Sequence, residues 1–302
     1  MKTLLTIILV AVVTFAADAQ IRITRTEELP LSRSRHWSNP QFSPNGRSVF
    51  YTDGDGNGIW EYSLQDRTSR RITEDPKSGF AFSLSQDGMS LVYRRTSESG
   101  QTRTQEIVMM NLARRTSSVL ATGPDVSNPS FSGNTPVYTV RSKTSGLAPT
   151  TARAVISVLG IENTKIALNV GGRKVIVDPH GNGSYVWPEI SPDNRRLVAY
   201  EMDRGAFVCD LDGANLIALG RRNAPSWARS GRWIIYMDDR DDGHRLLASD
   251  LWAISPDGSS SLQLTMTRQT IELNPRCSPT ENKIVCSTAD GSILVFEYEE
   301  QQ

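Results

Sequence analysis

The chain has 302 residues, of which 38% are hydrophobic and 22% are charged. Lys and Arg together number 33, as do Asp and Glu, so the formal net charge is zero. This balance excludes a general electrostatic attraction to nucleic acid or to anionic lipid, and three cysteines are too few for a disulfide-built scaffold. The composition is that of a soluble globular protein whose fold depends on a hydrophobic core.

The first 19 residues are typical of a secretory signal peptide. Lys2 gives a positive start, the run from Leu4 to Ala17 is almost wholly apolar, and Ala17-Asp18-Ala19 has the small-x-small pattern of a cleavage site. This run is shorter than the roughly 20 residues that span a bilayer, which argues against a membrane anchor. We therefore expect cleavage after Ala19, no integral membrane segment in the remaining chain, and a periplasmic or secreted location.

One pattern recurs six times along the rest of the chain: a Pro, an apolar residue two positions later, a tight polar turn and an apolar run. Ser43-Pro44-Asn45-Gly46 shows why this pattern predicts a hairpin, since Pro presets the first corner and Gly accepts the left-handed conformation. The residues after the turn, Val49-Phe50-Tyr51, are typical of a buried strand. The six copies are marked by Pro40, Phe82, Pro129, Pro188, Pro225 and Pro275.

A third and a fourth strand follow in most copies, as in Gly58 to Tyr62 and Arg71 to Thr73 of the first. Four strands per repeat is the pattern of a propeller blade. Sharing residues 20–302 among six copies gives about 47 residues each, which is within the usual range for a blade. The sequence therefore predicts an all-β, six-bladed β-propeller with four-stranded blades, filling residues 20–302 as a single domain.

The two ends of the chain predict how the ring closes. The last copy supplies three strands and then ends, whereas Ile21-Arg22-Ile23-Thr24 alternates apolar and polar residues before the first copy. We expect this N-terminal segment to pair into the last blade as its missing strand, which would remove exposed sheet edges. The alternative is a disordered N-terminal tail.

The segment 139–186 is longer than its equivalents and has no clear register. We expect strands at Ala154 to Leu159, Lys165 to Val170 and Lys174 to Val177, with a loop from Thr144 to Thr151. These strands are assigned to the blade of the third copy.

The motifs FSPNG at Phe42, ISPDN at Ile190 and DLWAISPDG at Asp250 resemble the repeats of TolB-like propellers, which are related to WD-type repeats. The resemblance covers Ile21 to Glu300 and implies the fold more than an activity, because the motifs are turn and core chemistry. TolB itself is a periplasmic component of a cell-envelope complex and has an additional α/β domain before its propeller. About twenty residues separate the expected cleavage site from the first copy, so the resemblance implies a TolB-like propeller rather than TolB.

No catalytic motif is evident in the sequence. The three histidines, His36, His180 and His244, form no metal-binding pair and accompany no nucleophile elbow. Some polysaccharide lyases with related propellers use His and a divalent metal at the axis, so a lyase or hydrolase with its site at the axis is the alternative to a binding protein. Such an enzyme would gather acid and base groups at the axis.

The segment from Asp53 to Gly58 matches the first half of a calcium loop, with Asp53, Asp55 and Asn57 as alternating oxygen donors. Leu64 stands where the bidentate Glu of such a loop would be. The segment also falls where a turn between two strands is required, so a plain turn is favoured and no cofactor is expected.

Cys277 and Cys286 flank the turn of the sixth copy on neighbouring strands. A disulfide between them and a role in core packing both remain open, with core packing favoured because a free cysteine behaves as a small hydrophobic residue.

Segments that lead into the innermost strands of a propeller converge at one mouth of its central channel, so their residues are the ligand candidates. They combine aromatic rings with mostly positive charges, which suit an acidic peptide or an anionic glycan. We therefore expect an exported, non-enzymatic scaffold that binds a protein or peptide, for instance at the cell envelope. The candidate residues are Arg35, His36, Trp37, Lys77, Asp125, His180, Tyr185, Arg221, Arg222, Arg268 and Glu272.

Overall fold

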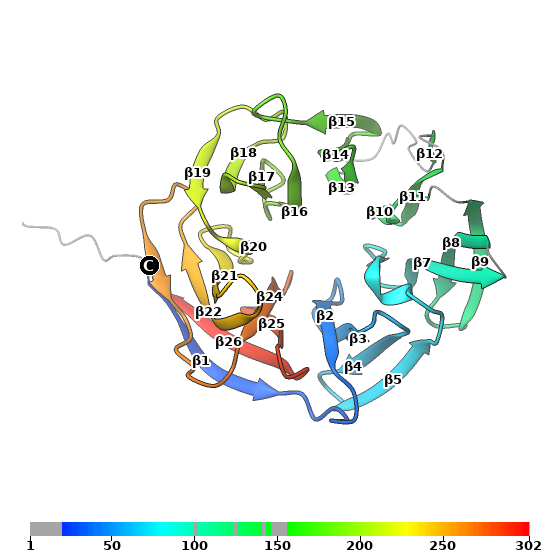
Figure 1. The fold of residues 1–302 in the computed structure, drawn as a ribbon, viewed down its shortest axis with the longest axis horizontal. Helices are drawn as coiled ribbons and strands as arrows, with labels where there is room; N and C mark the ends of the chain where they lie inside the picture. The colour runs from blue at the N-terminus through cyan, green and yellow to red at the C-terminus, as the bar shows by residue number, and fades with distance from the viewer. Residues whose placement is uncertain (1–19, 100–101, 124–125, 141–142, 146–155, 302) are drawn as a thin grey trace, which may run out of the picture.

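The structure, a computed structural model, describes residues 20–99, 102–123, 126–140, 143–145 and 156–301 (Figure 1). In these ranges the chain folds into seven antiparallel sheets arranged in a ring around a central axis. The expected signal peptide, residues 1–19, lies outside the described residues, as does Asp125. Within the described part, no helix is both long enough and apolar enough to cross a membrane.

Each sheet is built from strands that follow one another in sequence. The first two contain β2 (Trp37–Phe42), β3 (Ser48–Asp53), β4 (Ile59–Ser63) and β5 (Thr68–Thr73), then β6 (Phe82–Leu84), β7 (Ser90–Ser99), β8 (Thr102–Asn111) and β9 (Thr116–Gly123). A 3-10 turn, η1 (Ser78–Phe80), precedes β6. The next two are three-stranded and contain β10 (Ser130–Ser132), β11 (Thr135–Val140) and β12 (Lys143–Ser145), then β13 (Ile156–Glu162), β14 (Lys165–Val170) and β15 (Arg173–Val177).

The remaining three sheets have four strands each. The first two of these contain β16 (Tyr185–Ile190), β17 (Arg196–Glu201), β18 (Gly205–Asp210) and β19 (Ile217–Gly220), then β20 (Asn223–Trp227), β21 (Ile234–Asp241), β22 (Leu246–Ile254) and β23 (Ser261–Gln263). The last contains β24 (Glu272–Cys277), β25 (Lys283–Thr288), β26 (Ile293–Gln301) and, as its outer strand, β1 (Gln20–Glu28).

The predicted all-β propeller is confirmed, and each of the six sequence repeats begins one sheet. The described residues contain one sheet more than the six expected, namely β13–β15, and the count is corrected accordingly. Its strands lie close to those predicted in the segment 139–186, but β13 contacts β10 on one side and β16 on the other. These strands therefore form a separate sheet of the ring instead of extending the third blade.

The strands of the extra sheet run in the opposite direction to the corresponding strands of the other sheets, which explains its lack of a repeat motif. In the other sheets, turns between the first and second strands meet at one end of the ring, as Gly46 does with Thr280 and Gln86 with Gly133. The turn between β13 and β14 lies at the other end, since the carbonyl of Thr164 accepts the N–H of Tyr185 at the start of β16.

The ring is closed as predicted, because β1 pairs with β26 from Gln20↔Gln301 to Glu28↔Leu294. Ile21 is 4% exposed and belongs to the core cluster of Phe296 and Tyr298. The N-terminal strand is thus an ordered part of the last sheet.

The Pro of the repeat has a structural role within the innermost strands. The residue before it has a positive φ of 49° at Asn39, 53° at Trp187, 47° at Ala224 and 53° at Asn274. Pairing with the second strand shifts register at each of these four sites. Because Pro cannot donate to a ladder, the bulge places it where no hydrogen bond is required.

The cysteines are free thiols in the core. Cys277 pairs with Ile284 and is therefore offset from Cys286, and no disulfide links the three cysteines, all of which lie in the described ranges. Cys209 is 1% exposed and Cys286 fully buried. Burial raises the pKa of the Cys209 thiol to about 12 and that of Cys286 well above its usual value.

Candidate functional site

We call the end of the ring that carries the segments leading into the innermost strands the loop face, and the opposite end the turn face. Antiparallel pairing places the turns between second and third strands on the loop face too, as in Trp37↔Asp53 and Tyr185↔Glu201. The predicted ligand residues that are described lie in these segments, but their surroundings differ widely.

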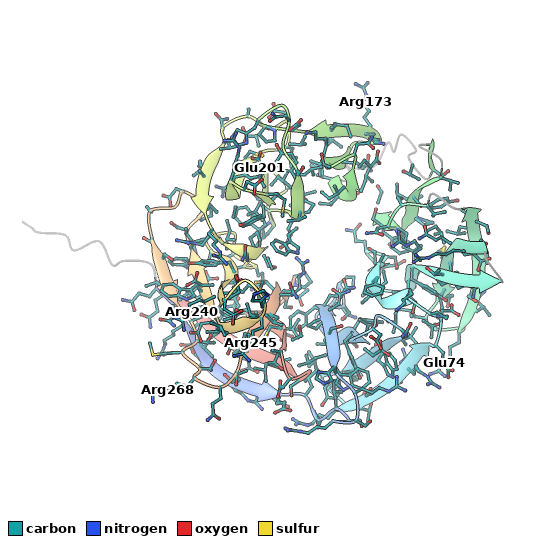
Figure 2. All side chains as sticks on the ribbon, in the orientation of Figure 1. Glu74, Arg173, Glu201, Arg240, Arg245 and Arg268 are labelled. Carbon is teal, nitrogen blue, oxygen red and sulfur yellow. The ribbon has the colours of Figure 1, made fainter. Side chains whose placement is uncertain are left out.

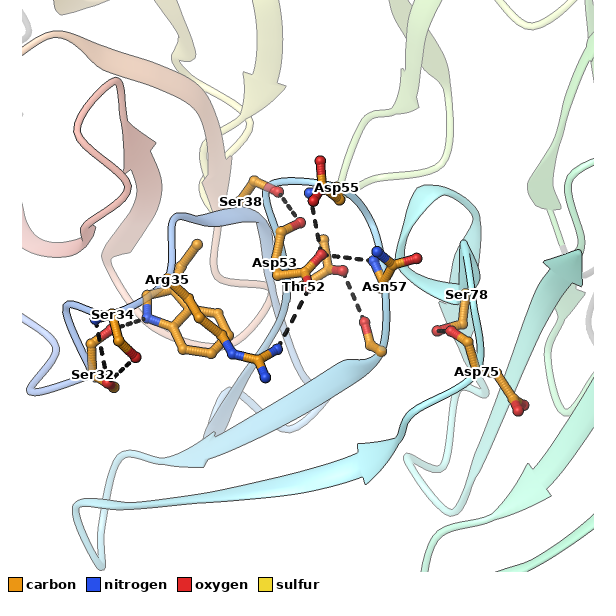
Figure 3. Close-up of polar contacts among 12 residues, drawn as sticks. Ser32, Ser34, Arg35, Ser38, Thr52, Asp53, Asp55, Asn57, Asp75 and Ser78 are labelled. Atoms are coloured by element: carbon orange, nitrogen blue, oxygen red, sulfur yellow. Dashed lines mark hydrogen bonds and ion pairs between the residues drawn. The ribbon is translucent and has the colours of Figure 1, made fainter.

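Arg35 is an exposed cation on this face. Its Nη1 lies 3.6 Å from Oδ2 of Asp53, and its side chain is 48% exposed (Figure 3). The guanidinium also lies 5.5 Å from the ring centroid of Trp60. A pair this long and this exposed contributes little stability, so the guanidinium can exchange Asp53 for an anionic ligand at low cost.

An aromatic cluster supports Arg35 from below. Trp37 packs edge-to-face against Tyr51 at 5.2 Å and against Trp60 at 5.0 Å. Trp37 is 6% exposed, and its Nε1 donates to the carbonyl of Ser32 at 2.9 Å. Trp37 is therefore a core residue that shapes the site, whereas the half-buried Trp60 presents part of its ring to solvent.

Arg35 lines three surface cavities, and two of them also share Ser34. One, of about 440 Å³, is lined by Pro30, Leu31, Ser32, Ser34, Arg35, Trp37, Tyr51, Trp60, Ser69 and Arg71. The other, of about 560 Å³, is lined by Ser34, Arg35, His36, Asp53, Gly54 and Asp55. Because Ser34 and Arg35 line both, we treat the two cavities as one feature and call it the Arg35 groove.

The Asp53 to Gly58 segment is a turn in which side-chain oxygens of Asp53 and Asn57 accept hydrogen bonds from the protein itself. Oδ1 of Asp53 accepts the N–H groups of Asp55 at 3.1 Å and Asn57 at 2.7 Å (Figure 3). Oδ1 of Asn57 accepts the N–H of Lys77, whose Nζ donates to the carbonyl of Asp55. With two cations directed at this turn, its residues do not fit a calcium site, and no cluster of three metal-ligating side chains occurs in the described ranges.

His180 and Tyr185 are held by internal partners. His180 Nδ1 lies 2.5 Å from Oε2 of Glu201, a carboxylate that is 3% exposed. Tyr185 is 2% exposed and donates to Asp178 at 2.8 Å, and burial raises the pKa of its hydroxyl. These two residues join the loop 178–184 to the sheet β16–β19, and of the two only His180 is exposed.

The arginines before β20 are also engaged within the protein. Arg221 lies 3.5 Å from both Asp239 and Asp241 on the long hairpin of β21 and β22. Arg222 stacks over Tyr236 at 4.9 Å. Both therefore anchor this hairpin.

The last two predicted residues, Arg268 and Glu272, do not line the Arg35 groove. Arg268 lies at the outer edge of the ring (Figure 2). Glu272 is fully buried, and its carboxylate oxygens lie 3.1 Å from Oγ1 of Thr267 and 3.2 Å from Oγ1 of Thr265. Burial raises the pKa of Glu272 to about 7.

Among the groove members that sequence reasoning missed, Trp60, Ser69 and Arg71 belong to the third and fourth strands of the first sheet. Pairing of Trp60 with Arg71 on neighbouring strands was the available signal, because cross-strand partners share a face of the sheet.

Charged groups at the axis neutralise one another. Glu189 on β16 lies 3.3 Å from Arg276 on β24 and accepts the N–H of Trp227 on β20 at 2.8 Å, so three sheets are bridged. The histidines are dispersed: His36 lies against Gly54 and Gly291, His180 binds Glu201, and His244 is exposed in a hairpin turn.

The arrangement of sheets and loops defines the fold as a β-propeller, similar to the propellers of TolB and of WD40-repeat proteins. TolB from Acinetobacter baumannii superposes with a TM-score of 0.53 and 18% identity, covering 78% of this chain and 55% of that protein, so the chain spans about half the length of that TolB. The WD40 repeats of RRP9 give a TM-score of 0.60 at 10% identity, covering 93% of this chain and all of that one.

An oligogalacturonate lyase in complex with manganese gives a TM-score of 0.50 at 13% identity, with 86% of this chain and 76% of that protein covered. Identities this low show a shared fold alone. No protein-family model and no curated protein sequence matches the chain.

Proposed function

We propose that this protein is an exported, non-enzymatic binding scaffold that recognises a protein or peptide through the Arg35 groove. On this proposal residues 1–19 are a cleaved signal peptide, residues 20–302 form one propeller domain, and the mature chain acts in the periplasm or outside the cell. The first two points rest on the N-terminal sequence and on the repeats.

The observation that carries the proposal is the combination of the exposed Arg35 guanidinium with the ring of Trp60 in one cavity. Arg and Trp are the residues most enriched where binding energy concentrates in protein interfaces. Ser32, Ser34 and Ser69 add hydroxyl groups to the same cavity. This chemistry fits a ligand segment with a carboxylate beside an apolar or planar group, such as an acidic peptide; an anionic glycan is the second ligand class.

The test compares variants that leave the buried residues Trp37 and Tyr51 in place. Arg35→Ala combined with Trp60→Ala removes the groove chemistry, whereas the control Arg195→Ala with Arg229→Ala removes two exposed arginines from the turn face. Trp37 is left unchanged because its burial would confound binding with folding. A partner captured by photocrosslinking from the cell envelope and identified by mass spectrometry should bind the wild type and the control equally.

Loss of that partner only in the groove variant supports the proposal, with an expected drop in affinity of at least roughly tenfold. Equal binding by all three proteins would overturn the assignment to the groove. Turnover of an anionic polysaccharide or a peptide that is abolished by His36→Ala or His180→Ala would overturn the scaffold and favour a lyase or hydrolase.

A further inference from the structure

Glu272, the first residue of β24, is a buried acid without a cation. It has no exposed surface, and among the described residues neither its hydrogen bonds nor its ion pairs include Lys, Arg or His. The titratable groups that face it are Asp250 on β22 and the thiol of Cys286 on β25. The loop 264–271 supplies its hydrogen-bond partners, Thr265 and Thr267.

More of the hydrogen bonds around Glu272 are satisfied when it is protonated than when it is ionised. Thr267 Oγ1 lies 3.1 Å from the Glu272 carboxyl, 2.9 Å from the carbonyl of Thr270 and 3.4 Å from Oδ1 of Asp250. A carboxylic acid can donate to Thr267, which then donates its single hydrogen to Thr270. Thr265 receives the N–H of Leu251 at 2.8 Å and donates its own hydrogen to the second Glu272 oxygen.

Ionisation of Glu272 breaks this chain of donors. The Thr267 hydroxyl then has one hydrogen for three acceptors, the Glu272 carboxylate, the Thr270 carbonyl and Asp250, so Glu272 no longer contributes a donor and one further bond is lost. A buried charge without a cation adds a desolvation cost. Burial raises the pKa of Glu272 to about 7, with the nearby Asp250 adding to the shift, so both protonation states are accessible near neutral pH.

We propose that Glu272 is a proton-operated latch for the loop 264–271: in its protonated form it fastens the loop on the loop face, and ionisation loosens it. Backbone N–H groups of Leu264 and Thr265 donate to Leu251, and that of Thr267 donates to Asp250, so the latch acts on a loop that these bonds also tether. The loop presents Met266, which is 81% exposed. Its last residue, Ile271, accepts the N–H of Ala289, and Gly291 in the same turn accepts the N–H of Trp37. The latch is therefore joined to the floor of the Arg35 groove through one turn.

Hydrogen exchange of the loop tests the latch without any ligand. Amide protection of residues 264–271 is measured by mass spectrometry at about pH 5.5 and about pH 8.5 and corrected for intrinsic exchange rates. The pKa of the Glu272 carboxyl is about 7 in the fold and 4.5 when the group is released, so protection should fall roughly thirtyfold from the acidic to the alkaline condition. Equal corrected protection at both pH values would overturn the proposal.

Three variants separate the latch from other titrations. Glu272→Gln keeps a donor for Thr267 and an acceptor for Thr265, so the loop should stay protected at both pH values. Thr267→Val removes the relay hydroxyl, so protection should be low at both. The control Glu281→Gln, on the turn face, should follow the wild type. A Glu272→Gln loop that keeps the wild-type pH dependence, or a Thr267→Val loop that remains protected at acidic pH, would overturn the proposal.

Discussion

The closure of the ring by β1 predicts a sharp contrast between two neighbouring residues. Ile21 faces the core and is 4% exposed, whereas the Arg22 side chain is 64% exposed and pairs only with Glu299 on the surface. Ile21→Ala removes three carbons at about 0.8 kcal/mol each and leaves a cavity, so we expect a loss of about 3 kcal/mol in the free energy of unfolding. Arg22→Ala should cost less than about 0.5 kcal/mol.

Urea unfolding followed by tryptophan fluorescence measures both variants against the wild type. For a chain of this size, the Ile21→Ala loss corresponds to a fall of about 5 °C in melting temperature. If Ile21→Ala cost less than about 1 kcal/mol, or no more than Arg22→Ala, β1 would be a loosely attached tail. The reasoning that the N-terminal strand closes the ring would then be wrong.

Three further predictions concern packing, thiols and pH. Gly79→Ala should destabilise the fold by about 1–3 kcal/mol, because a Cβ there would overlap Thr52. A Cβ at Gly123 would make ordinary contacts, so Gly123→Ala should cost far less when both variants are compared in thermal melts. The three cysteines should react with a thiol reagent at about pH 8 only after unfolding, since each thiol has a raised pKa in the fold. The pKa of Glu272 is raised from 4.5 to about 7, so its contribution to the free energy of unfolding should fall by on the order of 3 kcal/mol as the pH rises through this range. Denaturant titrations at several pH values should find this decrease in the wild type and not in Glu272→Gln.

The repeats could be predicted because their information is local. In Ser43-Pro44-Asn45-Gly46 the turn chemistry, and in Val49-Phe50-Tyr51 the buried strand, are each fixed by a few adjacent residues. Gly46 indeed has a φ of 71°. The pairing of the N-terminal strand with the last sheet could also be anticipated, because the strand missing from that sheet matched an alternating segment at the other end of the chain.

The sheet β13–β15 escaped prediction because it lacks the Pro motif and runs against its neighbours. Its three strands were expected almost in place, but the sequence gives no sign that β13 contacts both β10 and β16 as an innermost strand of its own. The direction of a strand in a ring depends on contacts distant in sequence, here Asn169 with Ser132 and Thr164 with Tyr185.

In the candidate site, the exposure of individual side chains could likewise not be predicted from the sequence. The sequence placed Arg35, Trp37 and Glu272 in loop-face segments, but exposure within such a segment depends on the neighbouring sheet. Trp37 is covered by Tyr51 and Trp60, while Arg35, two residues earlier, stays half exposed. The face of the ring on which a segment lies is thus predictable. Tertiary packing decides which of its side chains are exposed to solvent.

The Arg35 groove and the Glu272 latch are connected through the backbone. Ile271, Ala289, Gly291 and Trp37 form a continuous backbone connection between the loop 264–271 and the groove floor. If the groove binds its ligand more tightly in the latched form, ligand binding must raise the apparent pKa of Glu272 by the same free energy that protonation adds to binding. The sign follows from that condition: because the proton holds the loop in place, such a ligand binds more tightly at acidic than at alkaline pH.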